Sequence, residues 1–462
     1  MESAVQAGNQ PQTSDWLEMD AEHNIHPYCD GLDIIKSGIT VIAKGEGSYV
    51  WDSDGNKILD GMAGLWCVNV GYGRTELAEA ASRQMSELPY YNMFFQSSTP
   101  PQISLADKLS EITPDGLDNF FFANSGSEAN DSIVRLVRHF WIKQGQPEKS
   151  HFIARNKGYH GSTLASVSLG GLAAMHDMER ELLPGFHHIP EPHYWARNDG
   201  KTEAEFAQAC ANELEAKILE LGAKNVAAFV AEPVQGAGGV IPPPEGYWPA
   251  VERVCRKHDV LLVADEVICG FGRLGEWFGS QHYGITPDIM PMAKGLSSGY
   301  LPISAVAFNA RIAEGLRSSG ALVHGFTYSG HPVCCAVAHA NIAILEEEGL
   351  IERTREETGP YFRELLQQVT GTHPLVGELR AEGLVAGIQL MQDRDAKIHF
   401  PPGHEAAVFC RKHALANGLI MRAVESTMVL CPPLVISRSE LDELAEKVSA
   451  SLDATARHFG IA

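Results

Sequence analysis

Between residues 65 and 330 the chain repeats one pattern, an apolar run followed by a glycine-bearing loop and an amphipathic helix. Examples are NFFFANSG before SEANDSIVRLVRHFW, and AAFVAEPV before EGYWPAVERVCRKH. A continuous apolar strand is stable only when both of its faces are covered, and an intervening helix lets the next strand run parallel to it. The pattern therefore predicts the α/β class, with a mainly parallel sheet flanked by helices.

The pattern changes on both sides of this region. The stretch YVWDSDGNKILD (residues 49–60) predicts a hairpin, because alternating residues flank an Asp-Gly turn. After about Cys335 a long helix, AVAHANIAILEEEG, leads into a series of shorter elements. We expect strands near residues 376–390 and 428–430, and helices near residues 404–417 and 439–459.

A chain of 462 residues is long enough for two domains. We expect a large domain over residues 66–334, which contains the repeated pattern. Residues 1–65 and 335–462 are expected to form a smaller α+β domain together, so that the two ends of the chain meet.

The composition narrows the classes of partner. The chain has 36 Lys and Arg against 58 Asp and Glu, a formal net charge of −22, which argues against nucleic acids and anionic membranes as partners. No apolar run approaches the roughly 20 residues of a membrane helix, and no secretion signal is visible. Nine scattered cysteines without a C-x-x-C pair indicate reduced thiols and a cytoplasmic location. The 19 histidines show no metal-site spacing, so no metal is expected.

The segment GFGRLG (residues 270–275) matches the G-x-G-x-x-G pattern of dinucleotide-binding proteins. That fingerprint must open directly into a helix whose N-terminus holds the pyrophosphate. Here EWFGSQHYGI follows, without a clean helical stripe, and the preceding strand ends in two acids that would repel phosphates. The sequence therefore disfavours a nicotinamide-dependent dehydrogenase.

The segment NSGSEAN (residues 124–130) lies where an apolar strand turns into an amphipathic helix that is expected to begin near Glu128. Free backbone N–H groups and the helix dipole make such a turn a phosphate site. An ordinary serine N-cap explains the same residues equally well. No Walker lysine follows, which argues against a nucleoside triphosphate.

Two further segments place an acid and a lysine in apolar surroundings. VLLVADEV ends a predicted buried strand at Asp265, and PMAKGLSSG sets Lys294 among apolar residues and glycines. A structural ion pair is one interpretation, although buried pairs are weak sources of stability. A phosphate site, an acid and a desolvated lysine together also match what pyridoxal 5′-phosphate (PLP) requires.

The chain resembles the class III, or ω-, aminotransferases of PLP fold type I over essentially its whole length. NSGSEAN, GYHGST, AEPVQGAGG, VADEVICGFGR, AKGLSSGY and HGFTYSGHP occur in the family's order and with its spacing. GLWCVNVGYGR and PYYNMFFQ look most like the amine:pyruvate and putrescine:pyruvate branch.

The resemblance implies how the cofactor is held. Lys294 would bond covalently to the cofactor aldehyde and act as catalytic base, and Asp265 would face the ring nitrogen. Tyr159, in GYHG, would stack on one face of the ring, and Val267 would pack on the other. The remaining assignments are Gly126 and Ser127 for the phosphate, Thr327 for the phosphate of the neighbouring subunit, and Glu232 for an acid near the ring.

The resemblance also assigns the substrate pocket. Arg422, in GLIMRAV, would receive a substrate carboxylate. Where relatives often carry Gly-Asp, this chain has Glu425 and Ser426, a departure that concerns the substrate range more than the reaction. Four residues would line the amine pocket, with plain core packing as the alternative for the aromatic ones: Trp66, Phe94, Tyr159 and Ala237.

The implied activity is transfer of an amino group from a primary amine or ω-amino acid to pyruvate, with ping-pong kinetics. A homodimer with shared active sites is implied, with a tetramer as the alternative. Rival activities on the same fold are a 2-oxoglutarate-dependent aminotransferase, an aminomutase and a decarboxylase. A non-catalytic regulator of this fold would need a DNA-binding domain or a lost lysine, and the sequence shows neither.

Overall fold

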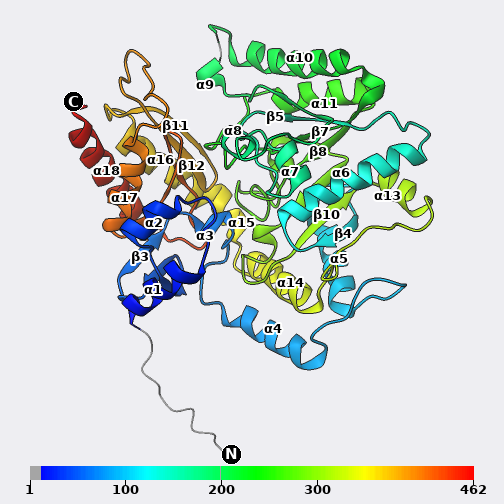
Figure 1. Ribbon diagram of the computed structural model, residues 1–462, viewed down its shortest axis with the longest axis horizontal. Coiled ribbons are helices and arrows are strands. Elements are labelled where there is room, and N and C mark those ends of the chain that lie inside the picture. The colour runs from blue at the N-terminus through cyan, green and yellow to red at the C-terminus, as the bar shows by residue number, and fades with distance from the viewer. Residues whose placement is uncertain (1–11, 198, 462) are drawn as a thin grey trace, which may run out of the picture.

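The computed structural model describes residues 12–197 and 199–461 (Figure 1). The middle of the chain forms a large sheet with helices on both faces, on the right of Figure 1. The two ends of the chain occupy the other side of the molecule. There the Tyr49 hydroxyl donates a hydrogen bond to Glu443 at 2.7 Å, so an N-terminal strand contacts the last helix.

The large sheet has seven strands in the order β4-β10-β9-β8-β7-β5-β6. β10 runs antiparallel to both of its neighbours, and the other six strands run in one direction. The predicted α/β class with a mainly parallel sheet is confirmed. The strands are β4 (Asn119–Ala123), β5 (His151–Arg155), β6 (Phe186–Ile189), β7 (Val226–Ala231), β8 (Leu261–Ala264), β9 (Ile289–Met292) and β10 (Ser304–Phe308).

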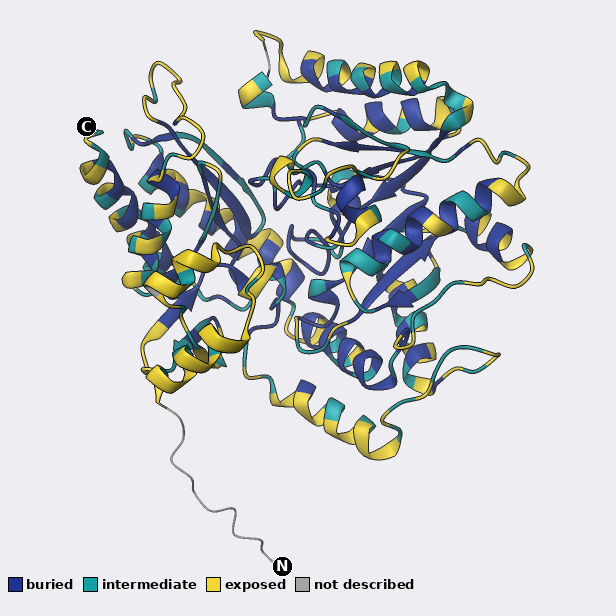
Figure 2. Ribbon diagram, in the orientation of Figure 1, coloured by how far each residue is buried: buried dark blue, intermediate teal, exposed yellow. Residues whose placement is uncertain are grey.

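Both faces of this sheet are covered, which explains its apolar strands. All six residues of β7 are buried. On β5, Phe152 and Ala154 pack on one side and Ile153 on the other, as the two-residue period of a strand requires. Figure 2 shows the buried strands between helices whose outer faces are exposed. Helices α6 (Gly126–Lys143) and α13 (Ala310–Arg317) cover the first side, and α10 (Glu203–Leu221) and α11 (Tyr247–Lys257) the second.

Two smaller sheets bring the ends of the chain together. One is antiparallel in the order β11-β12-β15-β14, and the other has the order β1-β2-β3-β13. The predicted hairpin at residues 49–60 is confirmed as β2 and β3, and β3 pairs in parallel with β13, Leu59 opposite Leu419. The strands are β1 (Ile42–Glu46), β2 (Tyr49–Asp52), β3 (Lys57–Asp60), β11 (Val376–Glu382), β12 (Val385–Leu390), β13 (Leu419–Ile420), β14 (Arg422–Val424) and β15 (Thr427–Leu430).

The remaining helices surround these sheets. None of the described helices is long and apolar enough to cross a membrane. The predicted domain limits fall inside α3 and α14, so the division at residues 66 and 334 stays a prediction. The helices are α1 (Thr13–His23), α2 (Gly31–Ser37), α3 (Ala63–Trp66), α4 (Thr75–Glu87), α5 (Pro100–Ile112), α7 (Leu164–Leu169), α8 (Ala173–His176), α9 (Tyr194–Arg197), α12 (Gly279–Tyr283), α14 (Pro332–Glu347), α15 (Leu350–Arg353), α16 (Gly359–Thr370), α17 (Ala406–Ala416) and α18 (Arg438–Phe459).

Candidate active site

One cavity lies at the carboxyl ends of the parallel strands of the large sheet. Strands that run in one direction end at the same edge, which is where open α/β sheets bind ligands. The loops after β4, β5, β7, β8 and β9 each contribute side chains to this cavity. Its lining residues are Gly126, Ser127, Asn130, Tyr159, His160, Gly161, Glu232, Asp265, Val267, Ile268 and Lys294.

Lys294 follows β9 and opens the short 3₁₀ helix η2 (Lys294–Leu296). Its φ of 45° lies in the left-handed region, a strained conformation for a residue with a side chain. The Nζ atom lies 5.6 Å from the ring centre of Trp66 and 6.0 Å from that of Tyr159. Burial lowers the pKa of Lys294, against the opposing effect of nearby acidic groups. The site therefore favours the neutral amine, which is the nucleophilic form.

Asp265 is held in one orientation at the end of β8. Its Oδ2 accepts a hydrogen bond from Asn130 Nδ2 at 2.9 Å and lies 2.7 Å from His160 Nδ1. Its Oδ1 accepts from the backbone N–H of Val267 at 3.1 Å. With a side chain only 2% exposed, the carboxylate offers a fixed, buried negative charge to whatever occupies the cavity.

Sequence reasoning did not select Asn130 or His160 as site residues. Both belong to quoted motifs, NSGSEAN and GYHGST, but nothing in either motif shows that its side chain reaches Asp265. The helical period offers one signal, because Asn130 lies four residues, about one turn, after Gly126 at the start of α6. Its Oδ1 has no hydrogen-bond partner among the described residues, although it is buried.

Glu232 is a second buried acid behind Tyr159. Its Oε1 accepts from the backbone N–H of Tyr159 at 3.1 Å, and its Oε2 from that of Gly236 at 2.9 Å. Burial raises its pKa, and nearby Asp265 acts in the same direction. Glu232 thus ties the loop after β5 to the loop after β7.

The N-terminus of α6 faces the cavity. The helix begins at Gly126, two residues before the predicted Glu128, and the Ser125 hydroxyl accepts from the N–H of Glu128 at 3.2 Å as a cap. The first N–H groups of a helix have no partner within the helix, so those near Gly126 and Ser127 are available to an anion. The serine cap and the anion site are therefore compatible, because they use different N–H groups.

Glycine is required where the loops meet at this turn. Gly161 has a φ of 135°, and a Cβ there would lie 2.6 Å from the Oγ of Ser127. A Cβ on Gly126 would lie 3.2 Å from Val267. The absence of these side chains keeps the space beside the helix terminus open.

An aromatic and aliphatic wall stands next to Lys294. Trp66 and Ala237 belong to one buried cluster, against which Tyr159 packs. The guanidinium carbon of Arg422 lies 5.0 Å from the ring centre of Trp66, and burial lowers the pKa of Arg422. These four predicted residues are thus brought together.

Tyr28 reaches the same wall and was not predicted. Its hydroxyl lies 3.4 Å from the Oγ of Ser162, and the Tyr159 hydroxyl lies 3.2 Å from that atom. A single aromatic residue in the polar stretch HPYCDG carries no periodic signal, so only the folded chain places it here.

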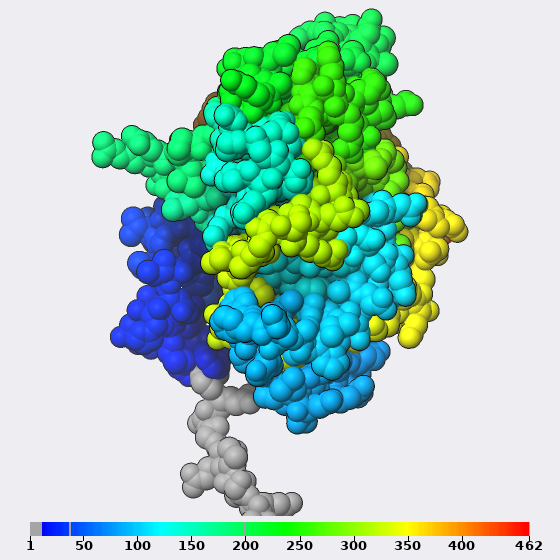
Figure 3. Space-filling model, turned by 90° about the vertical axis from the view of Figure 1, so that its right-hand side faces the viewer, coloured from blue at the N-terminus to red at the C-terminus, as the bar shows by residue number. Residues whose placement is uncertain are grey.

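Phe94 and Thr327 do not line the cavity around Lys294. A Cβ on Gly325 would lie 2.6 Å from Phe94, and the Thr327 carbonyl accepts from the Tyr90 hydroxyl at 2.7 Å. Figure 3 shows this face, where the segment around residue 325 crosses the surface beside the segments around residues 95 and 120. An open hollow there is lined by Met93, Phe94, Phe95, Phe120, Phe121, Phe122, Arg135, Ala321, Leu322, Val323, His324, Gly325 and Ser329.

Two features raised by the sequence have other partners. Glu425 lies 3.4 Å from Lys157 and is 76% exposed, so its ion pair is with that lysine. The GFGRLG segment forms turns, and the next helix, α12, begins only at Gly279. Arg273 of this segment is buried and donates to Asn69 Oδ1 at 2.8 Å and to the Leu384 carbonyl at 3.1 Å. The turn therefore joins interior segments and does not open a helix onto a dinucleotide.

Comparison with known proteins assigns the family. A family model described as aminotransferase class-III matches residues 35–452. The chain belongs to the class III aminotransferases. Class III aminotransferases depend on PLP, and PLP is the cofactor of this protein.

Relatives of this aminotransferase include enzymes with different named substrates. It is 51% identical to the putrescine–pyruvate aminotransferase of Pseudomonas aeruginosa, over 96% of this chain and 97% of that protein. It is 43% identical to the diaminobutyrate–2-oxoglutarate transaminase of Halomonas elongata, over 89% and 90% respectively. The ω-transaminase of Pseudomonas jessenii in complex with PMP superimposes with a TM-score of 0.94 at 43% identity, over 96% of this chain and 99% of that one.

The residues at the cavity fit this cofactor. A desolvated amine, a fixed carboxylate and the N-terminus of an 18-residue helix line one cavity. Asn130, whose Oδ1 has no partner among the described residues, lines the same cavity as Gly126 and Gly161. An imine, a ring nitrogen and a phosphate require these three kinds of group.

Proposed function

We propose that this aminotransferase moves an amino group from a primary amine or an ω-amino acid to pyruvate, giving an aldehyde or ketone and alanine. One observation carries the proposal: Arg422 lies against Trp66, which lies 5.6 Å from the Lys294 amine. A cation that binds a carboxylate thus adjoins an aromatic wall that accepts the carbon chain of an amine. The name of the Pseudomonas aeruginosa relative supports this pairing of donor and acceptor.

In this proposal the cavity residues hold PLP as follows. Lys294 would bond to it, Asp265 would face its ring nitrogen, and Tyr159 and Val267 would pack on its two faces. Gly126 and Ser127 would hold its phosphate, while Glu232 would fix the loop that carries Tyr159. The chemistry that PLP supplies when bound is an aldehyde that takes up the amino group and a ring that delocalises electrons.

Lys294 is the proposed proton carrier. A neutral Nζ takes the proton from the substrate carbon that bears the nitrogen and later returns a proton, acting as base and then as acid. Burial lowers the pKa of this amine and so raises the neutral fraction near neutral pH. Asp265 would keep the ring nitrogen of PLP protonated, because its buried carboxylate lines the cavity and its orientation is fixed by Asn130 and His160.

Arg422 is the residue that we propose recognises the carboxylate of the amino-group acceptor. Its guanidinium binds the pyruvate carboxylate through two parallel hydrogen bonds. Amines without a carboxylate would meet an unpaired cation there, so the arginine must move aside for them. A long side chain that lies over the Trp66 ring without an ion pair described for it fits such a movement.

We further propose that the active form is a homodimer in which each active site contains residues of both subunits. The alternative is a tetramer made of two such dimers. Support comes from the hollow that contains Phe94. Phe95 is 93% exposed and Val323 84% exposed beside it, and large exposed apolar patches mark association surfaces. A second copy placed on this face would bring Phe94 and Thr327 to the site of its neighbour.

We also propose a cytoplasmic location. All nine cysteines are free thiols in the structure. Free thiols persist in reducing compartments, which the cytoplasm provides.

The test is a matrix of donors and acceptors. Putrescine, β-alanine and propylamine are each incubated with pyruvate or 2-oxoglutarate, and alanine or glutamate is measured. We expect alanine from pyruvate with all three donors. Glutamate without alanine would instead support the 2-oxoglutarate-dependent activity suggested by the Halomonas elongata relative, and release of CO₂ or an isomerised amine would support the other two rivals.

A further inference from the structure

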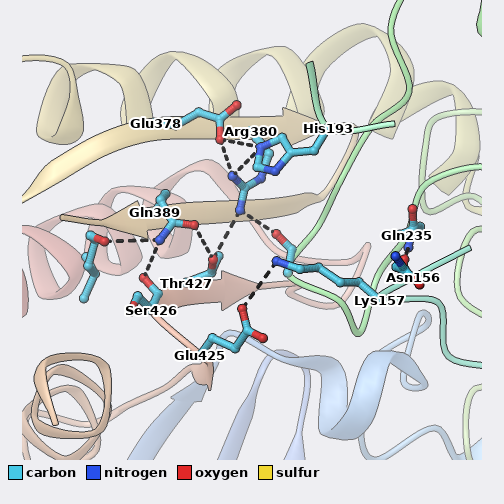
Figure 4. A network of polar contacts seen from close by, with 12 residues as sticks. Asn156, Lys157, His193, Gln235, Glu378, Arg380, Gln389, Glu425, Ser426 and Thr427 are labelled. Atoms are coloured by element: carbon cyan, nitrogen blue, oxygen red, sulfur yellow. Dashed lines mark hydrogen bonds and ion pairs between the residues drawn. The ribbon is translucent and has the colours of Figure 1, made fainter. Parts of the chain in front are cut away.

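A buried arginine contacts both the loop that carries Ala237 and the hairpin that carries Arg422. Arg380, on β11, has a side chain only 5% exposed. Its Nε donates to the Val240 carbonyl at 2.7 Å, and its Nη2 to the Gly239 carbonyl at 2.8 Å and to Thr427 Oγ1 at 3.3 Å. Figure 4 shows Arg380 between Glu378 and His193 on one side and Thr427 on the other. All sides of the guanidinium are used, because the remaining nitrogen, Nη1, pairs with Glu378 and adjoins His193.

The two carbonyls belong to the segment that carries Ala237 of the pocket wall. Gln235 and Ile241 exchange backbone hydrogen bonds of 3.1 and 2.8 Å, which closes this segment into a loop. Glu232 holds the start of the loop through the N–H of Gly236. Arg380 holds its far end, so the position of Ala237 is set from both sides.

Thr427 belongs to the hairpin that carries Arg422. It opens β15 and pairs with Val424 of β14, whose first residue is Arg422. The Thr427 hydroxyl also donates to Gln389 Oε1 at 2.9 Å, and Gln389 Nε2 donates to the Ser426 carbonyl at 3.4 Å (Figure 4). One guanidinium therefore contacts both the loop that bears Ala237 and the hairpin that bears Arg422.

The two segments are in direct contact at this point. A Cβ on Gly387 of β12 would lie 2.6 Å from the Gly239 carbonyl oxygen. Gly239 itself has a φ of 108°, and a Cβ there would lie 3.4 Å from Thr427 Oγ1. With no room between loop and sheet, a change at the guanidinium is transmitted to both.

We propose that Arg380 is a positioning residue for substrate selectivity. By holding the 235–241 loop against the β14–β15 hairpin, it sets the separation between Ala237 and Arg422, and with it the size of the amine that fits between them. Arg380 does not line the cavity around Lys294, so it acts through these neighbours. The inference rests on the proposed amine:pyruvate activity and names what fixes its substrate range.

Burying the Arg380 charge costs desolvation free energy, so the ion pair with Glu378 is a weak source of stability. Replacing a buried ion pair by apolar residues of similar volume is often neutral or stabilising. An arginine that pairs with Glu378 and also binds three groups on two pocket segments has a geometric use that a methionine would not have.

The test compares Arg380→Lys and Arg380→Met with a matched control, Arg394→Met. Arg394 is half-buried and also donates to two backbone carbonyls, those of Gly371 and His373, but neither segment reaches the pocket. A lysine at 380 keeps the charge beside Glu378, but its ammonium has three N–H donors where arginine has five, so it cannot bind Glu378, both loop carbonyls and Thr427 together. Thr427→Val removes only the hydroxyl contacts and is a milder variant that keeps the guanidinium.

The measurements are kcat and kcat/KM for benzylamine and for propylamine with pyruvate, the KM for pyruvate, and calorimetric binding of propionate, an unreactive acid. We expect the ratio of kcat/KM for benzylamine to kcat/KM for propylamine to change by about tenfold in both Arg380 variants, because small misplacements of a pocket wall alter selectivity strongly. The kcat for propylamine should stay within about threefold of the wild-type value. The pyruvate KM and the propionate dissociation constant should rise together. Thr427→Val should shift this ratio in the same direction as the Arg380 variants but by a smaller factor, and Arg394→Met should leave the ratio unchanged.

An unchanged ratio in folded Arg380→Lys and Thr427→Val, with a normal thermal transition, overturns the positioning role. So does an equal loss of kcat for both amines, because that is the signature of general destabilisation. If wild-type protein forms no alanine from either amine, the proposed function fails first, and that failure is visible before any variant is compared.

Discussion

The Nδ1 atom of His160 lies 2.7 Å from the Oδ2 atom of Asp265, and both side chains are almost completely buried. Asn130 donates to the same oxygen at 2.9 Å. One carboxylate oxygen therefore has two partners, while the other accepts only from the backbone of Val267 among the contacts described. This asymmetry fixes the plane of the carboxylate and explains why an acid at a strand end remains available to a ligand.

Asp265→Asn should weaken cofactor retention and lower the rate by several orders of magnitude. Breaking a buried charge pair costs about 3–5 kcal/mol, and in the proposed site the lost partner would be the protonated ring nitrogen. The measurements are PLP retained after gel filtration and single-turnover rates. Asp288→Asn is the control, because Asp288 is also buried but binds Arg256 away from the cavity. Tight cofactor and a near-normal rate in Asp265→Asn would make this acid structural.

Lys294→Ala should abolish turnover while leaving phosphate-dependent binding of PLP. The variant loses the amine that we propose bonds to the cofactor and carries the proton, but it keeps the N-terminus of α6. Equilibrium dialysis measures the binding, and alanine formation measures the turnover. Lys224→Ala, at an exposed position outside the cavity, should retain full activity. Sustained multiple turnovers by purified Lys294→Ala would refute the assignment.

Lys294 should also give the cofactor-free protein a pH-dependent stability. Burial lowers its folded pKa below the ordinary value of 10.5. Between the folded pKa and 10.5 the unfolded chain binds more protons, so the contribution of Lys294 to stability rises with pH in that window. Below the folded pKa the ammonium is charged in both states, and its burial is most unfavourable.

Lys294→Met removes this titration. Its stability advantage over the wild-type apo-protein should be greatest near neutral pH and should shrink as the pH approaches 10.5. Urea unfolding of both proteins from about pH 7 to about pH 10 tests this. Parallel stability curves for the two proteins would show that Lys294 titrates as an ordinary exposed lysine.

The fold was largely predictable because its signals are local. β7 is apolar at all six positions, and α6 carries a buried stripe along one side. The sequence of each segment is therefore enough to predict whether it is a strand or a helix and which of its faces are buried. The direction of the strands then places Asp265 and Lys294 at one edge without further information. By contrast, the pairing of β13 with β3 joins Leu419 to Leu59 across most of the chain, and no short pattern contains it.

The same distinction applies to the site. His160 and Asn130 lie inside recognisable motifs, yet their contact with Asp265 depends on how three loops pack. Tyr28 has no pattern around it. Arg380 sits in an ordinary strand, and only the folded chain shows its guanidinium reaching Gly239 and Thr427. Side chains whose partners lie far along the chain carry little information in their immediate sequence.

Dilution should release activity and cofactor together if the sites are shared. In the proposed dimer, Thr327 contributes to a phosphate site in the neighbouring subunit, and a doubly charged phosphate needs several donors. Activity and bound PLP are followed as the protein is diluted, with mass determined by light scattering. Thr327→Val should shift the release to higher protein concentration, whereas Thr286→Val, at another exposed threonine far along the chain from residues 321–329, should not. A fully active monomer would rule out shared sites.

Arg422→Ala should separate the two substrates. In the proposed reaction one pocket accepts pyruvate, which has a carboxylate, and an amine that has only carbon or a second ammonium at that position. A lost charge-assisted hydrogen bond is worth roughly 1.5–3 kcal/mol, so the KM for pyruvate should rise by about one to two orders of magnitude. The half-reaction with propylamine should change little, because an amine without a carboxylate gains nothing from the guanidinium.

The structure gives this separation a specific cause. Arg422 lies over Trp66, and its neighbour in sequence Glu425 is engaged by Lys157, so the guanidinium is not neutralised by that acid and stays available to pyruvate. Stopped-flow spectra of the two half-reactions, recorded separately, provide the measurement, and Arg438→Ala serves as a control at an exposed position on α18. Lys157→Ala should free Glu425 to compete for Arg422 and weaken pyruvate binding in the same direction by a smaller factor. Equal damage to both half-reactions in Arg422→Ala would show that the arginine supports the pocket wall and does not read the carboxylate.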